Sequence, residues 1–176
     1  MGLLYRGSFT KLVEKPWRYS WLIPLALVLQ VVIFTPWFRS LKCGDCYTPP
    51  LYILSDILLL VPVVLNFSLG GMKILGLGLL LNLGVIAANG GYMPVPIDIV
   101  EEAGLVKAAN ALQSQGHYAN WTALNEGTRL SFLCDILTLP FKMPGGRLIF
   151  SAGDVFIGYG VLGLVWGGMT GKEKQK

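Results

Sequence analysis

Residues 72–88 read MKILGLGLLLNLGVIAA, an apolar run in which Lys73 is the sole charged side chain. About 20 apolar residues in a helix cross a lipid bilayer, and this run is nearly that long. Three other runs are comparable: residues 21–38, residues 51–67 after Pro49-Pro50, and residues 148–169. The sequence therefore predicts an all-α integral membrane protein built as a four-helix transmembrane bundle.

The composition supports this class. Hydrophobic residues make up 53% of the 176 residues and charged residues 14%, whereas a soluble domain carries about 25% charged residues. We expect one membrane domain over residues 1–176, in contact with membrane lipids. The net charge of +4 does not indicate nucleic-acid binding, because basic residues gather near the two ends of the chain. They are Arg6, Lys11, Lys15 and Arg18, then Lys172, Lys174 and Lys176. The positive-inside rule places both termini in the cytoplasm, which requires an even number of crossings.

Residues 89–147 then form one long outer segment. It opens with a turn-rich stretch at residues 89–96. Apolar residues recur at roughly helical spacing in residues 97–114, which predicts an amphipathic helix on the outer membrane face or, equally well, a solvated one. Residues 130–141 are apolar but too short to span, so we expect a short re-entrant segment.

Two acids stand in apolar surroundings, Asp135 in the re-entrant segment and Asp154 in the last span. A carboxylate inside a bilayer costs at least about 2.5–3.5 kcal/mol, which makes it a candidate functional residue. Asp154 should lie about 9 Å along its helix from the outer end, at a depth similar to that of Asp135. Two close carboxyl groups share a proton and can activate water. Alternatively, each acid is paired with Arg129, with Arg147 or with a backbone amide.

Three more polar residues lie in or beside the spans. Asn82 is expected to make a helix–helix hydrogen bond, or to act as an accessory to the site. Asn89 meets the outer turn and is a candidate for positioning a substrate. Asp56, near the outer end of its span, either caps or snorkels there or assists the acids, which also leaves a proton-relay function open.

The cysteines indicate no metal site. Cys43 and Cys46 form a Cys-x-x-Cys on the oxidising side, and a local disulfide is expected. One such pair with a single histidine, His117, does not complete a structural zinc site. Cys134 is expected to be a small packing residue. We predict no cofactor.

The C-terminal third carries the motifs Leu133-Cys134-Asp135-Ile136 and Phe150-Ser151-Ala152-Gly153-Asp154. They resemble the two aspartate motifs of lipoprotein signal peptidase, the bacterial signal peptidase II. The resemblance implies that Asp135 and Asp154 are the catalytic pair of an intramembrane aspartic endopeptidase. It also implies that Ser151 and Gly153, with Arg129 and Asn89, position a lipidated or membrane-anchored precursor at the outer face of the bacterial cytoplasmic membrane.

The chain as a whole resembles a family of small bacterial multi-pass membrane proteins known as a domain of unknown function. The shared motifs are Asn-Gly-Gly-x-Met-Pro at residues 89–94, Thr-Arg-Leu-x-x-Leu-x-Asp at residues 128–135, and Phe-Ser-x-Gly-Asp at residues 150–154. Beside the peptidase, a second hypothesis is a non-catalytic assembly subunit or small transport component, whose acids are structural or relay protons. The oligomeric state is left open.

Overall fold

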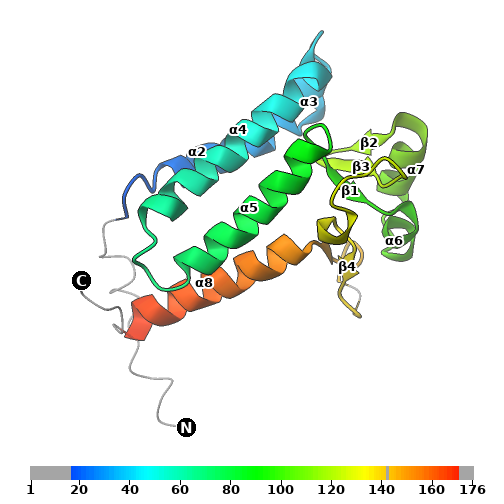
Figure 1. Cartoon of the computed structure of the whole chain (residues 1–176). Coiled ribbons are helices and arrows are strands. Elements are labelled where there is room, and N and C mark those ends of the chain that lie inside the picture. The colour runs from blue at the N-terminus through cyan, green and yellow to red at the C-terminus, as the bar shows by residue number, and fades with distance from the viewer. Residues whose placement is uncertain (1–16, 142, 171–176) are drawn as a thin grey trace.

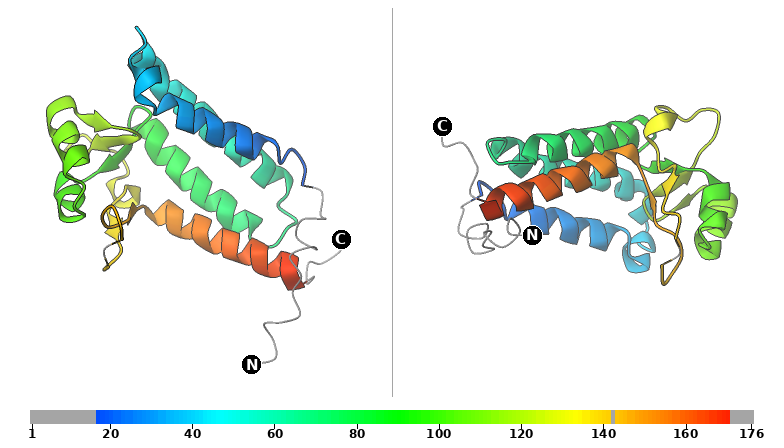
Figure 2. Two further views of the ribbon diagram at one scale, coloured as in Figure 1. Left: turned by 180° about the vertical axis from the view of Figure 1, so that it is seen from behind. Right: turned by 90° about the horizontal axis from the view of Figure 1, so that it is seen from below.

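Four apolar helices lie side by side in a computed structural model that describes residues 17–141 and 143–170. They are α2 (Leu22–Ile33), α4 (Gly44–Leu65), α5 (Met72–Ala88) and α8 (Ala152–Thr170). Helix α2 packs on α4, α4 on α5, and α5 on α8 (Figures 1 and 2). Most of the basic residues on which the orientation rests, Arg6, Lys11, Lys15, Lys172, Lys174 and Lys176, lie outside the described residues.

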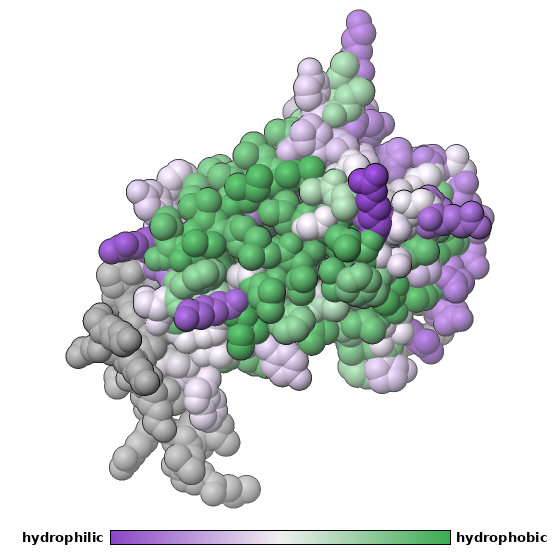
Figure 3. All heavy atoms as spheres, in the orientation of Figure 1, coloured by the Kyte–Doolittle hydropathy of each residue, from purple (hydrophilic) through white to green (hydrophobic). Residues whose placement is uncertain are grey.

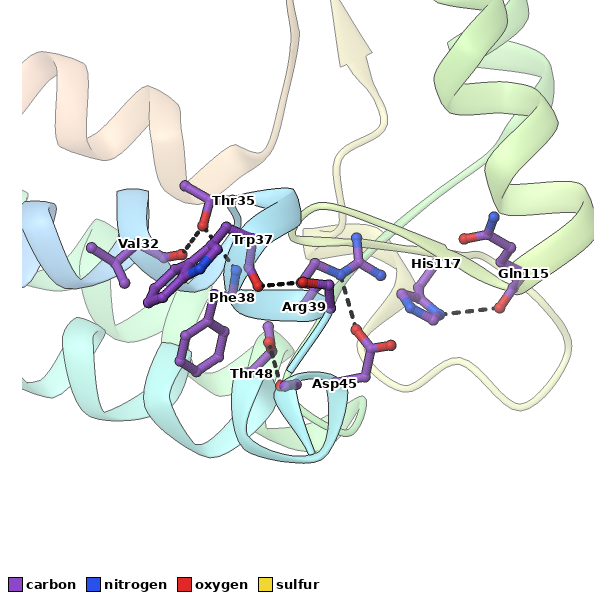
Figure 4. A network of polar contacts seen from close by, with 11 residues as sticks. Val32, Thr35, Trp37, Phe38, Arg39, Asp45, Thr48, Gln115 and His117 are labelled. Atoms are coloured by element: carbon purple, nitrogen blue, oxygen red, sulfur yellow. Dashed lines mark hydrogen bonds and ion pairs between the residues drawn. The ribbon is translucent and has the colours of Figure 1, made fainter. Parts of the chain in front are cut away.

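The first helix is shorter than residues 21–38. Helix α2 ends at Ile33, and a separate short helix, α3 (Pro36–Arg39), begins after Thr35. The Thr35 hydroxyl accepts a hydrogen bond from the Phe38 amide at 3.3 Å and donates one to the Val32 carbonyl at 2.7 Å (Figure 4). A threonine cap followed by proline at the first helical position favours a new helix start, which explains the break.

Helix α4 begins at Gly44, earlier than the predicted residue 51, so residues 44–50, which lie before the predicted span, are helical. Pro49 and Pro50 lie inside the helix and do not precede it. Proline removes an amide donor, but its fixed φ suits a helix, and the chain continues through both residues. Asp56 consequently lies in the middle of α4 and not near the end of a span. The bounds predicted for α5, residues 72–88, are confirmed.

The predicted span 148–169 begins too early, and the predicted re-entrant segment is wrong. Ile149–Phe150 form strand β5, and α8 follows from Ala152. Residues 130–141 contain a 3₁₀ turn, η1 (Ser131–Leu133), and strand β4 (Leu137–Thr138), which pairs antiparallel with β5. Phe132 is 67% exposed, and the Asp135 amide donates to the Pro94 carbonyl at 3.1 Å. The short apolar run thus folds onto the end of the bundle as a turn and a strand.

The outer segment builds a small α/β unit beside one end of the helices (Figure 1). It comprises β1 (Met93–Val95), α6 (Ile97–Glu102), α7 (Val106–Gln115), β2 (His117–Tyr118) and β3 (Trp121–Ala123). The strand order is β1-β3-β2, with β1 parallel and β2 antiparallel to β3.

The single amphipathic helix expected over residues 97–114 is two helices, because Gly104 adopts a left-handed φ of +83° between them. Much of the apolar stripe is buried inside the protein. Val100, Ala109 and Leu112 lie in one core with Val95 and Ile149. The position of these two helices relative to a membrane stays a prediction.

On the face that Figure 3 shows, apolar side chains cover the helical part of the molecule between its two ends. Among the described residues, α4 and α8 are long and apolar enough to cross a membrane, while α2 and α5 are shorter apolar helices. In the most apolar stretches of α4 and α8, 28% and 17% of the residues are buried inside the protein. Hydrophilic side chains gather over the α/β unit instead (Figure 3).

Candidate functional site

Asp154 and Asp135 lie where the N-terminus of α8 meets the α/β unit. Asp154 belongs to the first turn of α8, because the helix begins at Ala152. The predicted depth of about 9 Å along a helix is therefore wrong. Asp135 follows η1 and is tied to β1 through the Pro94 carbonyl.

Asp154 is held by three hydrogen-bond donors. The hydroxyl and the amide of Ser151 both donate to Oδ2 at 2.9 Å, and Asn82 Nδ2 donates to Oδ1 at 2.8 Å. The Asp154 amide in turn donates to Ser151 Oγ at 3.0 Å. These reciprocal bonds form a capping box at the start of α8. The donors and the positive end of the helix stabilise a negative charge on Asp154.

Asn82 makes the expected helix–helix hydrogen bond, and its partner is the candidate catalytic acid. Its Oδ1 also lies 2.9 Å from the Ser151 hydroxyl, whose single hydrogen is shared between this oxygen and Asp154 Oδ2. Two glycines permit this contact. A Cβ on Gly153 would overlap the Asn82 side chain, and a Cβ on Gly78 would lie 2.7 Å from the Ile157 amide nitrogen. Gly153 thus positions Asp154 indirectly, through the close approach of α5 and α8.

Asp135 has a different environment. It is 6% exposed, and its Oδ2 accepts the Trp121 indole N–H at 2.7 Å, while its Oδ1 is buried without a hydrogen-bond partner among the described residues. Burial raises the pKa of Asp135 to about 6, the Trp121 bond opposes that rise, and the charge of Asp154 adds to it. Burial and Asp135 also raise the pKa of the Cys134 thiol to about 11, in keeping with a packing residue.

The two acids are thus electrostatically coupled, but their carboxyl groups do not bond to each other directly. Within the described part of the chain, neither forms an ion pair with Arg129 or Arg147, the alternative partners. Asn89 is fully used by the backbone: its Nδ2 donates to the Val85 and Arg129 carbonyls, and its Oδ1 accepts the Arg129 amide. Asn89 therefore clamps the chain at Arg129, whose side chain is exposed.

A model of a family of unknown function, DUF5317, matches residues 14–166. The chain belongs to this family. No curated protein and no solved structure matches the chain at a significant level. The three motifs that suggested such a family fall inside the matched range. In this DUF5317 chain they carry Asn89, Asp135 and Asp154.

Two site residues were missed from the sequence. Trp121 was passed over because its bond to Asp135 depends on how β3 lies against the turn after η1. Tyr52, buried in α4, hydrogen-bonds to Asn120 and lies within electrostatic range of Asp56, Asp135 and Asp154. A lone tyrosine in an apolar run is a weak signal, although a buried phenol usually needs a partner.

Trp121 connects Asp135 to open space in the α/β unit of the DUF5317 chain. It lines a cavity of about 540 Å³ with residues 104–108, Tyr118 and Gly145. A second cavity of about 360 Å³ shares Leu105, Trp121 and Gly145 with the first and continues along residues 143–149. The two cavities therefore share part of their lining, which includes Trp121, the hydrogen-bond partner of Asp135; Asp135 itself lines neither cavity.

The remaining candidates lie elsewhere. Cys43 and Cys46 are exposed free thiols, so the predicted disulfide is not formed; Cys43 precedes α4 and Cys46 lies in its first turn. Near these thiols, Arg39 Nε forms an ion pair with Asp45 Oδ1 at 2.9 Å (Figure 4). Both residues line a cavity of about 390 Å³. No group of three or more His, Cys, Asp or Glu side chains comes together among the described residues.

Proposed function

We propose that this DUF5317 chain is a multi-pass membrane protein that hydrolyses a peptide bond with Asp135 and Asp154. The observation that carries the proposal is the contrast between two coupled carboxyl groups. Asp154 has three donors that favour its charge, whereas Asp135 is buried, has a free Oδ1 and has its pKa raised to about 6. Opposite environments of this kind separate a base from an acid.

The chemistry follows from these environments. Asp154 takes a proton from a water molecule, whose oxygen adds to the peptide carbonyl carbon. Asp135 gives the proton on its Oδ1 to the carbonyl oxygen. When the tetrahedral intermediate collapses, the C–N bond breaks and the leaving amine takes the proton held by Asp154. One hydroxyl of the intermediate returns its proton to Asp135 as the new carbonyl forms. Ser151 and Asn82 act as positioning residues that orient the Asp154 carboxylate.

The substrate in this proposal is a membrane-anchored or lipidated precursor. The four apolar helices cross the bacterial cytoplasmic membrane, both termini are cytoplasmic, and the α/β unit stands at the outer face. Two features support this placement: the length and composition of α4 and α8, and the low burial of their apolar side chains. The two cavities lined by Trp121 give the precursor chain a place beside the hydrogen-bond partner of Asp135.

A second candidate is a non-catalytic membrane protein, either an assembly subunit or a transport component. One observation favours it. The capping box with Ser151 and the bond from Asn82 account for both carboxylate oxygens of Asp154 without any reaction. Asp154 would then fix the start of α8 and its packing on α5.

The test uses the full-length protein in lipid nanodiscs with a precursor peptide that carries a diacylglyceryl cysteine. We expect cleavage by the wild type and a loss of about 100-fold or more in Asp135→Asn and in Asp154→Asn. Glu126→Gln, which removes an exposed acid of the α/β unit, should cleave like the wild type. The peptidase proposal is wrong if the wild type does not cleave, or if either aspartate variant retains full activity.

A further inference from the structure

Another buried acid lies between α2 and α4, away from the capping box of α8. Asp56 is 8% exposed and sits in the middle of α4. Gln30 of α2 reaches across, and its Nε2 donates to Asp56 Oδ1 and to Ser55 Oγ, each at 3.0 Å. The Ser55 hydroxyl donates to the Tyr52 carbonyl at 2.6 Å. Three polar side chains thus form one cluster in an apolar helix seam.

The second oxygen of this carboxyl group is buried. Asp56 Oδ2 makes no hydrogen bond to any residue that the structure describes. The surrounding helices offer no counter-charge, because α2 carries no charged residue and Lys73 of α5 is exposed. On α4 itself, Tyr52 is the titratable neighbour and Asp45 is ion-paired with Arg39. The charged residue of α8 is Asp154, an acid.

An ionised carboxylate in this place would keep one amide donor and no cation, which is an unfavourable state for a buried charge. A proton on Oδ2 removes the charge and leaves Oδ1 free to accept from Gln30. We propose that Gln30, Ser55 and Asp56 form a proton-binding site inside the helix bundle, separate from the Asp135–Asp154 pair.

Tyr52 gives this site a connection to the acid pair. It lies one helical turn before Asp56, and its side chain bonds to Asn120, the neighbour of Trp121. Trp121 donates to Asp135. Tyr52 therefore meets the Asp56 cluster through its backbone carbonyl and the α/β unit through its side chain. The proton site does not require that Asp135 and Asp154 hydrolyse anything.

Dicyclohexylcarbodiimide, an apolar reagent, tests the site on the full-length protein in lipid vesicles. The O–H of a protonated carboxyl adds across a C=N bond of the carbodiimide, and the O-acylisourea rearranges to a stable N-acylurea that mass spectrometry locates. We expect labelling at Asp56 that slows as the pH rises and is lost in Asp56→Asn. Asp45, exposed and ion-paired, is the unlabelled internal control. The carbonyl band of a protonated carboxyl in the infrared spectrum, also lost in Asp56→Asn, is the second readout.

Three outcomes separate the possibilities. Labelling that persists at Asp56 in Asp135→Asn supports a site independent of the peptidase proposal, even where that variant and the wild type both fail to cleave. Protection of Asp56 by sodium or potassium chloride, but not by choline chloride, would overturn the proposal in favour of a cation site. Absence of both the label and the infrared band at low pH would also overturn it.

Discussion

Asp135 links the free energy of unfolding to pH. Burial raises its pKa to about 6, whereas an aspartate in an unfolded chain titrates near about 4. Between these values the folded protein holds a proton that the unfolded chain has released. The folded state binds more protons there, so stability falls as the pH rises from about 4 through about 6 and stays lower above. A shift of this size corresponds to about 3 kcal/mol.

We therefore expect Asp135→Asn to flatten the dependence of the melting temperature on pH between about pH 4 and pH 7, and to raise it at neutral pH. Thermal unfolding in nanodiscs across this range measures the effect. Glu126→Gln is the matched control, because Glu126 is exposed and should leave the profile unchanged. An Asp135→Asn profile that parallels the wild type would show that Asp135 is not the group responsible.

Both acids could be chosen from the sequence, but most of their partners could not. The signature Ser151-x-x-Asp154 before an apolar run does predict a capping box, so that part of the site was accessible. Asn82 was predicted as an accessory residue, but its hydrogen bond to Asp154 depends on which sides of α5 and α8 pack against each other. The partnership of Trp121 and Asp135 needs the position of β3, which no local pattern encodes. Arg129 and Arg147 were candidates by charge alone, and neither reaches an acid.

At the scale of elements, the seam between α5 and α8 sets the geometry of Asp154. Gly78 and Gly153 let the two backbones approach, and the space above Gly153 is occupied by the Asn82 side chain. Gly158, one turn further along α8, faces open space. Substituting alanine at Gly153 and, separately, at Gly158 therefore separates the effect of helix propensity on stability from the effect of packing.

We expect Gly153→Ala to destabilise the protein by roughly 1–3 kcal/mol, because the added methyl displaces Asn82 and separates the helices. Gly158→Ala should be neutral or stabilising by about 0.5–1 kcal/mol, since alanine is favoured over glycine in a helix. Denaturant or thermal unfolding of both variants in the same detergent gives the comparison. Equal stability of the two would mean that the α5–α8 contact is looser than this packing implies.

The helix bounds show where apolar patterning is a sufficient guide. It predicted the bounds of α5 correctly, because Gly71 precedes that apolar run and the Asn-Gly-Gly turn follows it. It predicted the start of α4 wrongly, because Pro49 and Pro50 lie inside the helix. It also predicted the start of α8 wrongly, because the first apolar residues of that run form strand β5. It also missed the sheet, since strands of two or three residues are too short to show alternation. The apolar stripe of residues 97–114 was recognised, but its core is built from distant segments.

At the scale of the whole molecule, the two ends of the helix bundle differ. One end carries the α/β unit, the Asp135–Asp154 site and the exposed thiols of Cys43 and Cys46. The other end holds Trp17, the α4–α5 turn near Asn66, and the last turn of α8 (Figure 1). The described chain therefore begins and ends at the same end of the bundle.

The three cysteines allow the proposed orientation of the protein in the membrane to be tested without engineered labels. If the α/β unit faces outward, a membrane-impermeant maleimide added to intact spheroplasts should label Cys43 and Cys46. The double variant Cys43→Ser/Cys46→Ser should not react, because Cys134 is buried. In sealed inverted vesicles, labelling should require detergent, since the thiols then face the lumen. Labelling that occurs in inverted vesicles and not in spheroplasts would reverse the proposed orientation. The acid pair lies at the same end of the bundle as these thiols, so it would then face the cytoplasm.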